Sequence, residues 1–305
     1  MRFLLLPLVA GVALTAAKSS PSRIAPPPNP LIILVHGRGH LDDDSAALRR
    51  EWKRDLDTAL ALVGMPKLRD EDVRLAWYAD VLDPESEATC TDERAQAKID
   101  DDAADLGVFA RGLFSTLTSN LTKDESRGLR GLIGDMLFVV DGSKRCAAER
   151  RVGRAIEGAA REHRPVVLVA YSLGSLVTFD YLNSHAASDG LADVRLITMG
   201  SPLGVRELRE LMLGEIGDTL RVPKSVRSWE NIFDPYDVFS APLERIVTPR
   251  MVHDRMTRAE SSSESDAHQI DHYLRDRATG AALARAICAT SKDRIGAACE
   301  KLSPN

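Results

Sequence analysis

Residues 166–175, VVLVAYSLGS, constrain the fold of this chain more than any other segment. A continuous apolar run of this length is typical of a strand that is buried on both faces. The run ends in a small–x–Ser–x–Gly pattern, AYSLG at 170–174, and an amphipathic segment at 176–186 follows at once. A strand that turns this sharply into a helix needs small residues around the serine and exposes its hydroxyl above the sheet. Ser172 is therefore the candidate nucleophile, and the alternative is an ordinary strand-to-helix turn with a serine N-cap.

Apolar runs and helical patterns alternate along most of the chain. Strands are predicted at 31–37, 73–80, 166–172, 194–201 and 226–234. Helices are predicted within 38–64, at 148–163 and at 267–289, where apolar residues recur at helical spacing. This alternation predicts an α/β fold with a doubly wound, mainly parallel sheet. In such sheets, functional residues lie at the carboxyl ends of the strands.

The segment from about 81 to 141 breaks the alternation. It opens with an acidic, polar stretch and continues with two apolar, amphipathic segments at 105–121 and 129–140. These segments form either a lid above the site or an extension of the core. As a lid, the insertion would offer an acyl chain an apolar wall of side chains at helical spacing. The wall would consist of Phe109, Leu113, Phe114 and Leu117.

The two ends of the chain differ from its centre. Residues 1–17 combine a basic start, an apolar stretch and small residues, the pattern of a secretory signal peptide. An uncleaved anchor or a misassigned start codon are the alternatives. Residues 18–30 read as a Pro/Ser-rich linker, 31–290 as one domain with its insertion, and 291–305 as a tail. We therefore expect a secreted or periplasmic protein.

Four cysteines are compatible with export. An even number of cysteines behind a signal peptide allows disulfides, and we favour the pairs Cys288–Cys299 and Cys90–Cys146. The first closes a short loop near the C-terminus, and the second staples the insertion to itself. Buried thiols are the alternative. The cysteines lack the spacing of a zinc site.

The charge pattern argues against nucleic acid as a partner. The formal net charge is −5, and basic residues occur without a Lys/Arg-rich stripe or interleaved aromatics. The expected partners are a small-molecule or lipid ester, with peripheral membrane contact as a further option. No cofactor is expected.

A serine hydroxyl is a weak nucleophile and needs a base, and the base needs a carboxylate that orients it and stabilises its cation. The intermediate needs hydrogen-bond donors for its oxyanion. Candidates for these parts occur in the order oxyanion loop, Ser, Asp, His, which is the order of the α/β-hydrolase triad.

The chain resembles the α/β-hydrolases of the lipase/esterase type from about Leu31 to Leu274. The resemblance rests on the blocks LVHGRG, VLVAYSLGSLV, LITMGSPLG, WENIFDPYDVFSAPL and AHQIDHYL. It implies an α/β-hydrolase fold with a helical lid and Ser172 as the nucleophile. The implied oxyanion donors are the backbone N–H groups of Leu173 and of Arg38, in the loop after His36-Gly37.

The resemblance leaves two candidates for the acid and two for the base. Asp237 is preferred as the acid because it precedes an apolar pair, and Asp234, which precedes a proline, reads as a turn former. His268 is preferred as the base because it precedes the last helix, and His272 lies four residues further on.

The function implied is a serine hydrolase that cleaves carboxylic esters, with an apolar acyl group, through an acyl-enzyme. A thioesterase or acyltransferase would use the same residues. An inactive binding protein with the same fold is the alternative from a different class.

Overall fold

A six-stranded parallel sheet forms the centre of the protein. The computed structural model describes residues 29–83, 86–87, 90, 138, 141–185, 193–206, 209, 219–258, 267–290 and 299. The strand order is β2-β1-β3-β4-β6-β8, and every neighbouring pair is parallel. The strands are β1 (Leu31–Val35), β2 (Val73–Ala76), β3 (Val166–Tyr171), β4 (Val194–Met199), β6 (Val226–Phe233) and β8 (Val252–Met256). A separate two-stranded sheet pairs β5 (Leu220–Arg221) with β7 (Val247–Thr248).

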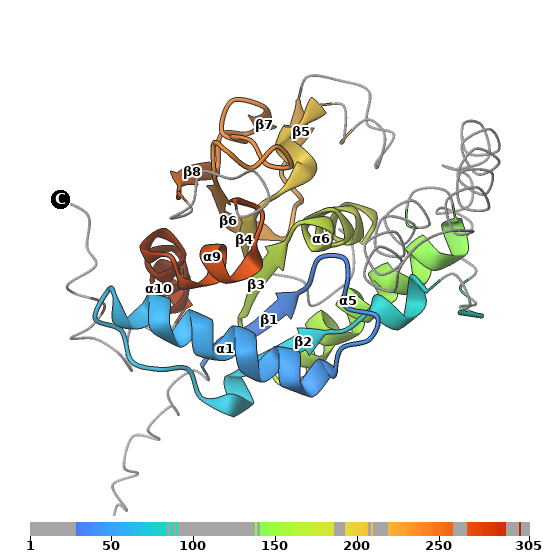
Figure 1. Ribbon diagram of the computed structural model, residues 1–305, viewed down its shortest axis with the longest axis horizontal. Coiled ribbons are helices and arrows are strands. Elements are labelled where there is room, and N and C mark those ends of the chain that lie inside the picture. The colour runs from blue at the N-terminus through green and yellow to red at the C-terminus, as the bar shows by residue number, and fades with distance from the viewer. Residues whose placement is uncertain are drawn as a thin grey trace, which may run out of the picture.

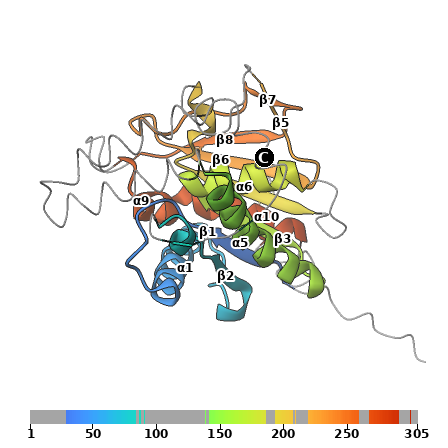
Figure 2. The same cartoon turned by 90° about the vertical axis from the view of Figure 1, so that its right-hand side faces the viewer.

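Helices cover both faces of the large sheet (Figure 1). The α-helices are α1 (Ser45–Ala61), α5 (Gly142–Arg161), α6 (Leu173–Ser184), α9 (Ile270–Arg275) and α10 (Arg277–Thr290). Short 3₁₀ turns are η1 (Asp70–Asp72), η2 (Ala79–Val81) and η4 (Pro202–Gly204). Figure 2 shows α5 and α6 on one face and α1, α9 and α10 on the other. The predicted α/β architecture with a mainly parallel sheet is confirmed.

The two faces of the sheet explain the continuous apolar runs. In β1, Leu31, Ile33 and Val35 pack towards α5 and α6, whereas Ile32 and Leu34 pack towards α1 and α10. Every residue of β1 and β3 is buried. A strand covered on both faces cannot alternate apolar with polar residues, and this is why the runs carry no period of two.

The order of the strands along the chain reverses between the two central strands β1 and β3. β1 lies between β2 and β3, so the connections after β1 and β3 run to opposite faces of the sheet. This is the switch point of a doubly wound sheet, where loops separate and ligands bind. Residues 36–40 follow β1 at this point, and Ser172 follows β3.

Several element predictions need correction. The predicted helix at 267–289 is two helices, because the backbone of Asp276 is extended (ψ 147°) and separates α9 from α10. The predicted helix at 148–163 begins at Gly142, where the Asp141 side chain accepts from two backbone N–H groups. Strand β8 was not predicted. Helix α6 is buried on almost all sides and not amphipathic, since each residue from Leu173 to Leu182 is buried.

Both favoured cysteine pairs are disulfides, Cys90–Cys146 and Cys288–Cys299, with Cα atoms 5.7 and 5.6 Å apart. Within the described ranges, no helix has the length and apolar character needed to span a membrane. The predicted signal peptide, most of the linker, most of the insertion with its proposed lid wall, and nearly all of the tail lie outside the described residues.

Candidate active site

Ser172 lies between β3 and α6 in a strained turn. Its φ is 51° and its ψ is −125°, in a region that residues with a side chain rarely adopt. The Ser172 N–H donates to Met199 O at 2.9 Å, which joins the turn to the end of β4. Ser172 is the N-cap of α6, but its side chain makes no capping hydrogen bond. Ser172 therefore holds the N-cap position that the alternative interpretation gave it, but its hydroxyl does not cap the helix.

Small residues surround this turn where the sequence predicted them. Gly174, two residues after Ser172, packs on the end of β1, and an added Cβ would lie 2.3 Å from His36 O. Ala170, two residues before Ser172, is fully buried in β3. The turn requires a small side chain at this position, and alanine meets that requirement as well as glycine does.

The two predicted oxyanion donors lie on either side of Ser172. Leu173 is the first residue of α6, where backbone N–H groups point along the helix axis towards the site. Arg38 follows Gly37 in the loop after β1. A Cβ added to Gly37 would lie 3.1 Å from Ser172 Cβ, so this loop runs directly against the serine. The loop after β1 and the first turn of α6 therefore both adjoin Ser172.

The structure brings Ser172, His268 and Asp237 into one hydrogen-bond chain. His268 Nε2 lies 3.0 Å from Ser172 Oγ, and His268 Nδ1 lies 2.8 Å from Asp237 Oδ2. The Asp237 side chain is fully buried, and that of His268 is 15% exposed. His268 precedes α9, as predicted. Beside it, Gly200 (φ 52°) leaves room, since an added Cβ would lie 3.3 Å from both His268 Cε1 and Asp237 Oδ2.

Two tyrosines that were not predicted as site residues form hydrogen bonds to Asp237 and His268. The Tyr273 hydroxyl donates to Asp237 Oδ2 at 2.6 Å and accepts from Asp234 N–H at 3.2 Å. The Tyr171 hydroxyl donates to the carbonyl oxygen of His268, and the two rings lie 5.3 Å apart. Burial and the charge of Asp237 raise the pKa of both tyrosines, so they remain protonated donors. Their place in the motifs, next to Ser172 and next to His272, is the only sequence signal for these roles.

The alternative acid and base form a pair of their own. His272 Nε2 lies 3.0 Å from Asp234 Oδ2, and the Asp234 side chain is fully buried. Asp234 Oδ1 also accepts from the backbone N–H of Tyr236 at 2.9 Å, which is the turn-forming role predicted for it. No hydrogen bond joins His272 to Ser172 in the structure. Asp234 and His272 therefore lie beside the Ser172–His268–Asp237 chain and not within it.

His36 is held as a neutral ring. Its Nδ1 lies 2.6 Å from Gly37 O, and its Nε2 accepts from Tyr78 N–H at 3.2 Å. Burial, with a smaller contribution from His40, lowers the pKa of His36 to about 3. Both ring nitrogens bond to the backbone, so this histidine ties the end of β1 to the segment after β2.

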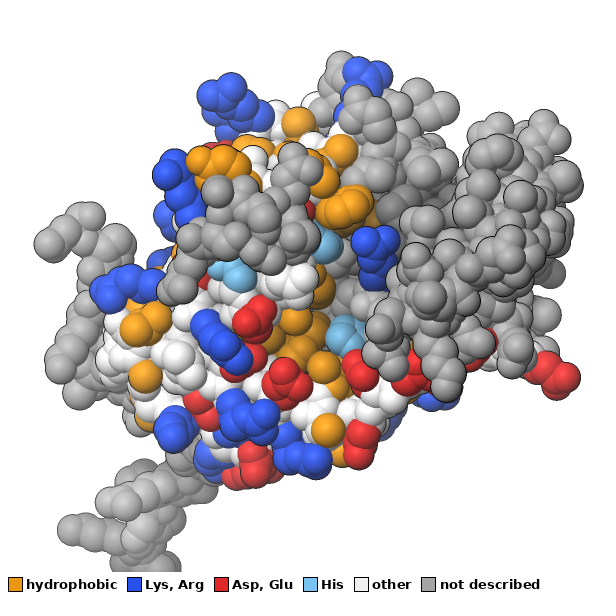
Figure 3. Space-filling view, viewed as in Figure 1, with side chains coloured by type: hydrophobic (Ala, Val, Ile, Leu, Met, Phe, Trp, Pro, Cys, Tyr) orange, Lys and Arg blue, Asp and Glu red, His pale blue; other side chains and the backbone are white. Residues whose placement is uncertain are grey.

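Aromatic and apolar side chains flank the site. The Phe239 ring lies 4.9 Å from the His268 ring, and the Arg38 guanidinium lies 5.5 Å from the centre of the Phe239 ring. Tyr236 and Val238 are 48% and 56% exposed. Figure 3 shows one face of the molecule, on which histidine side chains lie beside hydrophobic ones and charges of both signs are interspersed. The loop that carries Asp237 therefore presents apolar side chains beside His268.

This arrangement has the parts needed to activate a hydroxyl. An imidazole between a buried carboxylate and a serine can take the hydroxyl proton, because the carboxylate stabilises the resulting cation. Among the described residues, no group of three or more His, Cys, Asp or Glu side chains is placed to hold a metal ion.

Comparisons with known proteins do not assign this chain to a family. No family model matches the chain, and neither a curated protein nor a solved structure shows significant similarity to it. We therefore infer function from the geometry of the site itself.

Proposed function

We propose that this protein is a serine hydrolase of the α/β-hydrolase fold that cleaves carboxylic esters through an acyl-enzyme. The observation that carries the proposal is the hydrogen-bond chain from Ser172 Oγ through His268 to Asp237, at 3.0 and 2.8 Å. The strained backbone of Ser172 supports it, because such strain is typical of a serine nucleophile on a strand-to-helix turn.

In the proposed reaction, Ser172 Oγ attacks the ester carbonyl carbon while His268 Nε2 takes the hydroxyl proton. Asp237 orients the ring through Nδ1 and stabilises its positive charge. The Leu173 and Arg38 N–H groups stabilise the oxyanion of the tetrahedral intermediate. The intermediate collapses to an acyl-enzyme, and His268 gives its proton to the departing alcohol. Water then attacks the acyl-enzyme with the same base and releases the acid.

The topology supports the α/β-hydrolase assignment. The nucleophile follows a central strand, and the acid and base follow it in the order Ser172, Asp237, His268, as in α/β-hydrolases. The exposed Tyr236 and Val238 and the Phe239 ring support an apolar acyl group, from a small-molecule or a lipid ester. The two disulfides support a secreted or periplasmic location.

The test is labelling with a fluorophosphonate probe together with hydrolysis of p-nitrophenyl esters. We expect the protein to react and Ser172→Ala to be inert. Asp237→Asn and His268→Ala should each lower kcat/KM by about three orders of magnitude or more. The matched variants Asp234→Asn and His272→Asn should remain within about tenfold of the parent enzyme.

Each contrary result has a distinct meaning. A folded protein that neither reacts with the probe nor cleaves any ester would refute the hydrolase proposal and favour the inactive binding protein. Turnover of thioesters, or of an ester only with an acceptor alcohol, would replace ester hydrolysis with thioesterase or acyltransferase chemistry. Loss of activity in the Asp234 and His272 variants alone would transfer the acid and base roles to that pair.

A further inference from the structure

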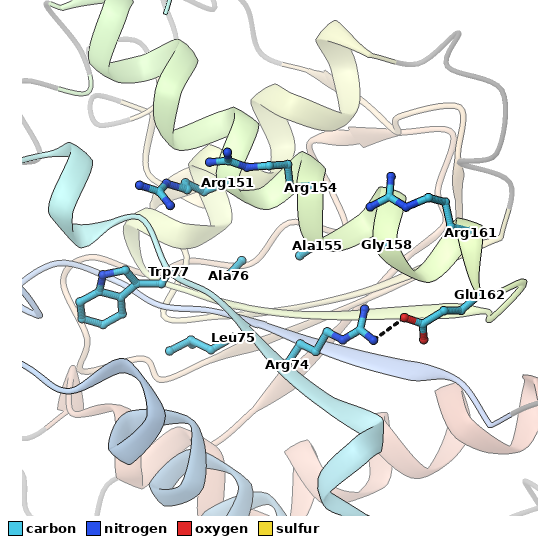
Figure 4. Close-up of a pocket in the computed structure, with 10 residues that line it drawn as sticks. All are labelled: Arg74, Leu75, Ala76, Trp77, Arg151, Arg154, Ala155, Gly158, Arg161 and Glu162. Atoms are coloured by element: carbon cyan, nitrogen blue, oxygen red, sulfur yellow. Dashed lines mark hydrogen bonds and ion pairs between the residues drawn. The ribbon is translucent and has the colours of Figure 1, made fainter. Parts of the chain in front are cut away.

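A second concave site lies away from Ser172, between the edge strand β2 and helix α5 (Figure 4). β2 is the last strand at its edge of the sheet, so β1 covers only one of its sides. The groove has a volume of about 630 Å³, the size of a small-molecule site. None of the residues that line it belongs to the proposed catalytic machinery.

The groove is rich in arginine. Arg151, Arg154 and Arg161 lie on one face of α5, because their spacings of three and seven residues follow the helical repeat. Arg74 faces them from β2 (Figure 4). Glu162 is the single acidic residue in the lining among the described residues. The whole chain has a net charge of −5, so four arginines in one groove are not a general property of its surface.

Most of these arginines have exposed acidic partners. Arg74 pairs with Glu162 at 2.5 Å and Arg151 pairs with Asp80 at 2.6 Å. Arg161 lies 3.8 Å from Glu157, one helical turn earlier on α5. Exposed ion pairs of this kind contribute little free energy, typically up to about 1 kcal/mol, so a ligand with more charge can replace them.

Arg154 differs from the others. It is exposed, and it makes no ion pair or hydrogen bond with any residue in the described ranges. It lies one turn from Arg151, at a spacing where like charges on a helix repel. An anion placed between the two guanidinium groups would remove this repulsion and accept hydrogen bonds from Arg154, which has no partner among the described residues.

A glycine on α5 leaves room for the Arg74 side chain in the groove. Gly158 lies between Arg154 and Arg161 on the same helix face, and an added Cβ would lie 3.1 Å from Arg74 Nη1. The absence of a side chain there lets the Arg74 guanidinium lie across the helix. The groove from Arg151 to Arg161 is roughly 15 Å long, at 1.5 Å of rise per residue.

We propose that this groove binds a phosphate-bearing polyanion. Guanidinium groups match phosphate oxygens in pairs, and every phosphate of such a ligand carries negative charge and several acceptor oxygens. A ligand with two or more phosphates spans the distance between the arginines, whereas one monovalent ion reaches only one end. The ligand is a soluble oligophosphate or a membrane surface on which the headgroups of neighbouring anionic phospholipids present several phosphates, and both offer the same chemistry to the groove.

The test uses the full chain and two probes: inorganic tripolyphosphate, measured by calorimetry, and vesicles of phosphatidylcholine with one-fifth phosphatidic acid, measured by co-sedimentation. Arg154→Gln should weaken binding of the preferred probe at least tenfold, and Arg151→Gln with Arg154→Gln should abolish it. Arg50→Gln is the matched control, because it removes an exposed arginine from α1 on the other face of the sheet. Ester hydrolysis by Arg154→Gln should equal that of the parent, which keeps this test separate from the proposed function.

Tripolyphosphate binding that depends on Arg154 supports a soluble ligand. Vesicle binding that depends on Arg154, without tripolyphosphate binding, supports a lipid headgroup. Absence of saturable binding to either probe, or equal weakening by Arg154→Gln and Arg50→Gln, overturns the proposal, because the arginines would then act only through general charge. Because Arg154 has no described partner, its substitution is not expected to change the melting temperature, and this is measured alongside.

Discussion

At the scale of single residues, the buried carboxylate of Asp237 has more donors than the sequence indicated. Phe239 N–H donates to Oδ1 at 2.9 Å, while His268 and Tyr273 both contact Oδ2. A buried carboxylate is costly unless it is hydrogen-bonded, and each of these donors offsets that cost. Tyr273 also accepts from Asp234 N–H, so one hydroxyl connects the two aspartates. We interpret Tyr273 as a positioning residue for Asp237.

Tyr273→Phe tests this interpretation. A hydrogen bond to a charged group contributes about 1.5–3 kcal/mol, so we expect kcat/KM for an ester to fall by about ten- to a hundredfold. The loss should fall on kcat, because the hydroxyl does not face the substrate. Tyr181→Phe is the matched control, because it removes the hydroxyl of a buried tyrosine on α6. If both variants lose the same activity and show the same drop in melting temperature, the Tyr273 hydroxyl has a structural role only.

The sequence predicted which of two aspartates and two histidines form the chain with Ser172, and the geometry agrees with that preference. It did not predict that the alternatives would pair with each other. Asp234 and His272 are brought together because Asp234 begins a turn and His272 lies in α9, a contact between segments 38 residues apart. No local pattern encodes such a contact, since it depends on how α9 docks on the end of β6.

At the scale of secondary structure, the apolar runs of β1 and β3 were predictable because a doubly covered strand leaves a continuous signal. β8 left no such signal. It is the other edge strand, and only Val252 within it is buried, while His253, Asp254 and Arg255 carry the polar surface. The break between α9 and α10 was also hidden, because Asp276 has no proline or glycine beside it.

Helices α5 and α6 share a buried charged cluster that the sequence did not reveal. Arg145 and Glu149 of α5 and Asp180 of α6 are each less than 8% exposed, and Arg145 forms an ion pair with Asp180. Burial and the charge of Asp180 raise the pKa of Glu149 to about 9. This shift favours the protonated form of Glu149 in the folded protein.

This protonation makes stability depend on pH. The folded state keeps a proton that the unfolded chain loses near pH 4.5, so this contribution is present at low pH and is lost as the pH rises towards 9. Glu149→Gln keeps a neutral group at this position. Relative to the parent, its free energy of unfolding should therefore increase with pH between 5 and 8, by up to about 1.4 kcal/mol per pH unit. Urea unfolding at several pH values measures this.

Glu157→Gln, on the exposed side of α5, is the control for a change of charge on the same helix. Its difference from the parent should vary little over this range. A Glu149→Gln difference that is constant with pH would show that Glu149 is ionised in the folded state.

At the scale of the whole molecule, the candidate site exists only when the sheet is complete. Ser172 follows β3, Asp237 follows β6, and His268 precedes α9, at a sequence separation of 96 from Ser172. The predicted architecture was sufficient to place Ser172 and Asp237 at the carboxyl ends of parallel strands, whereas His268 was predicted from its position before the last helix. The extent of the insertion and its role stay predictions, as most of segment 81–141 lies outside the described residues.

The two disulfides constrain the molecule over very different lengths of chain. Cys90–Cys146 spans 56 residues and holds the first turn of α5, where Cys90 N–H also donates to Ser143 Oγ at 3.1 Å. Cys288–Cys299 spans 11 residues at the end of α10. Loop-closure entropy increases with loop length, which gives contributions of about 4 kcal/mol for the longer loop and about 3 kcal/mol for the shorter one.

We therefore expect Cys90→Ala with Cys146→Ala to lower the free energy of unfolding more than Cys288→Ala with Cys299→Ala. Denaturant unfolding with and without a thiol reductant measures both effects, and a variant that lacks all four cysteines controls for the reductant. The reductant should destabilise the parent by about the sum of the two losses and leave the four-alanine variant unchanged. If the unfolding curve of the parent does not move in reductant, the protein carries no stabilising disulfide. The cysteines would then be structural thiols, and they would no longer support a location in an oxidising compartment.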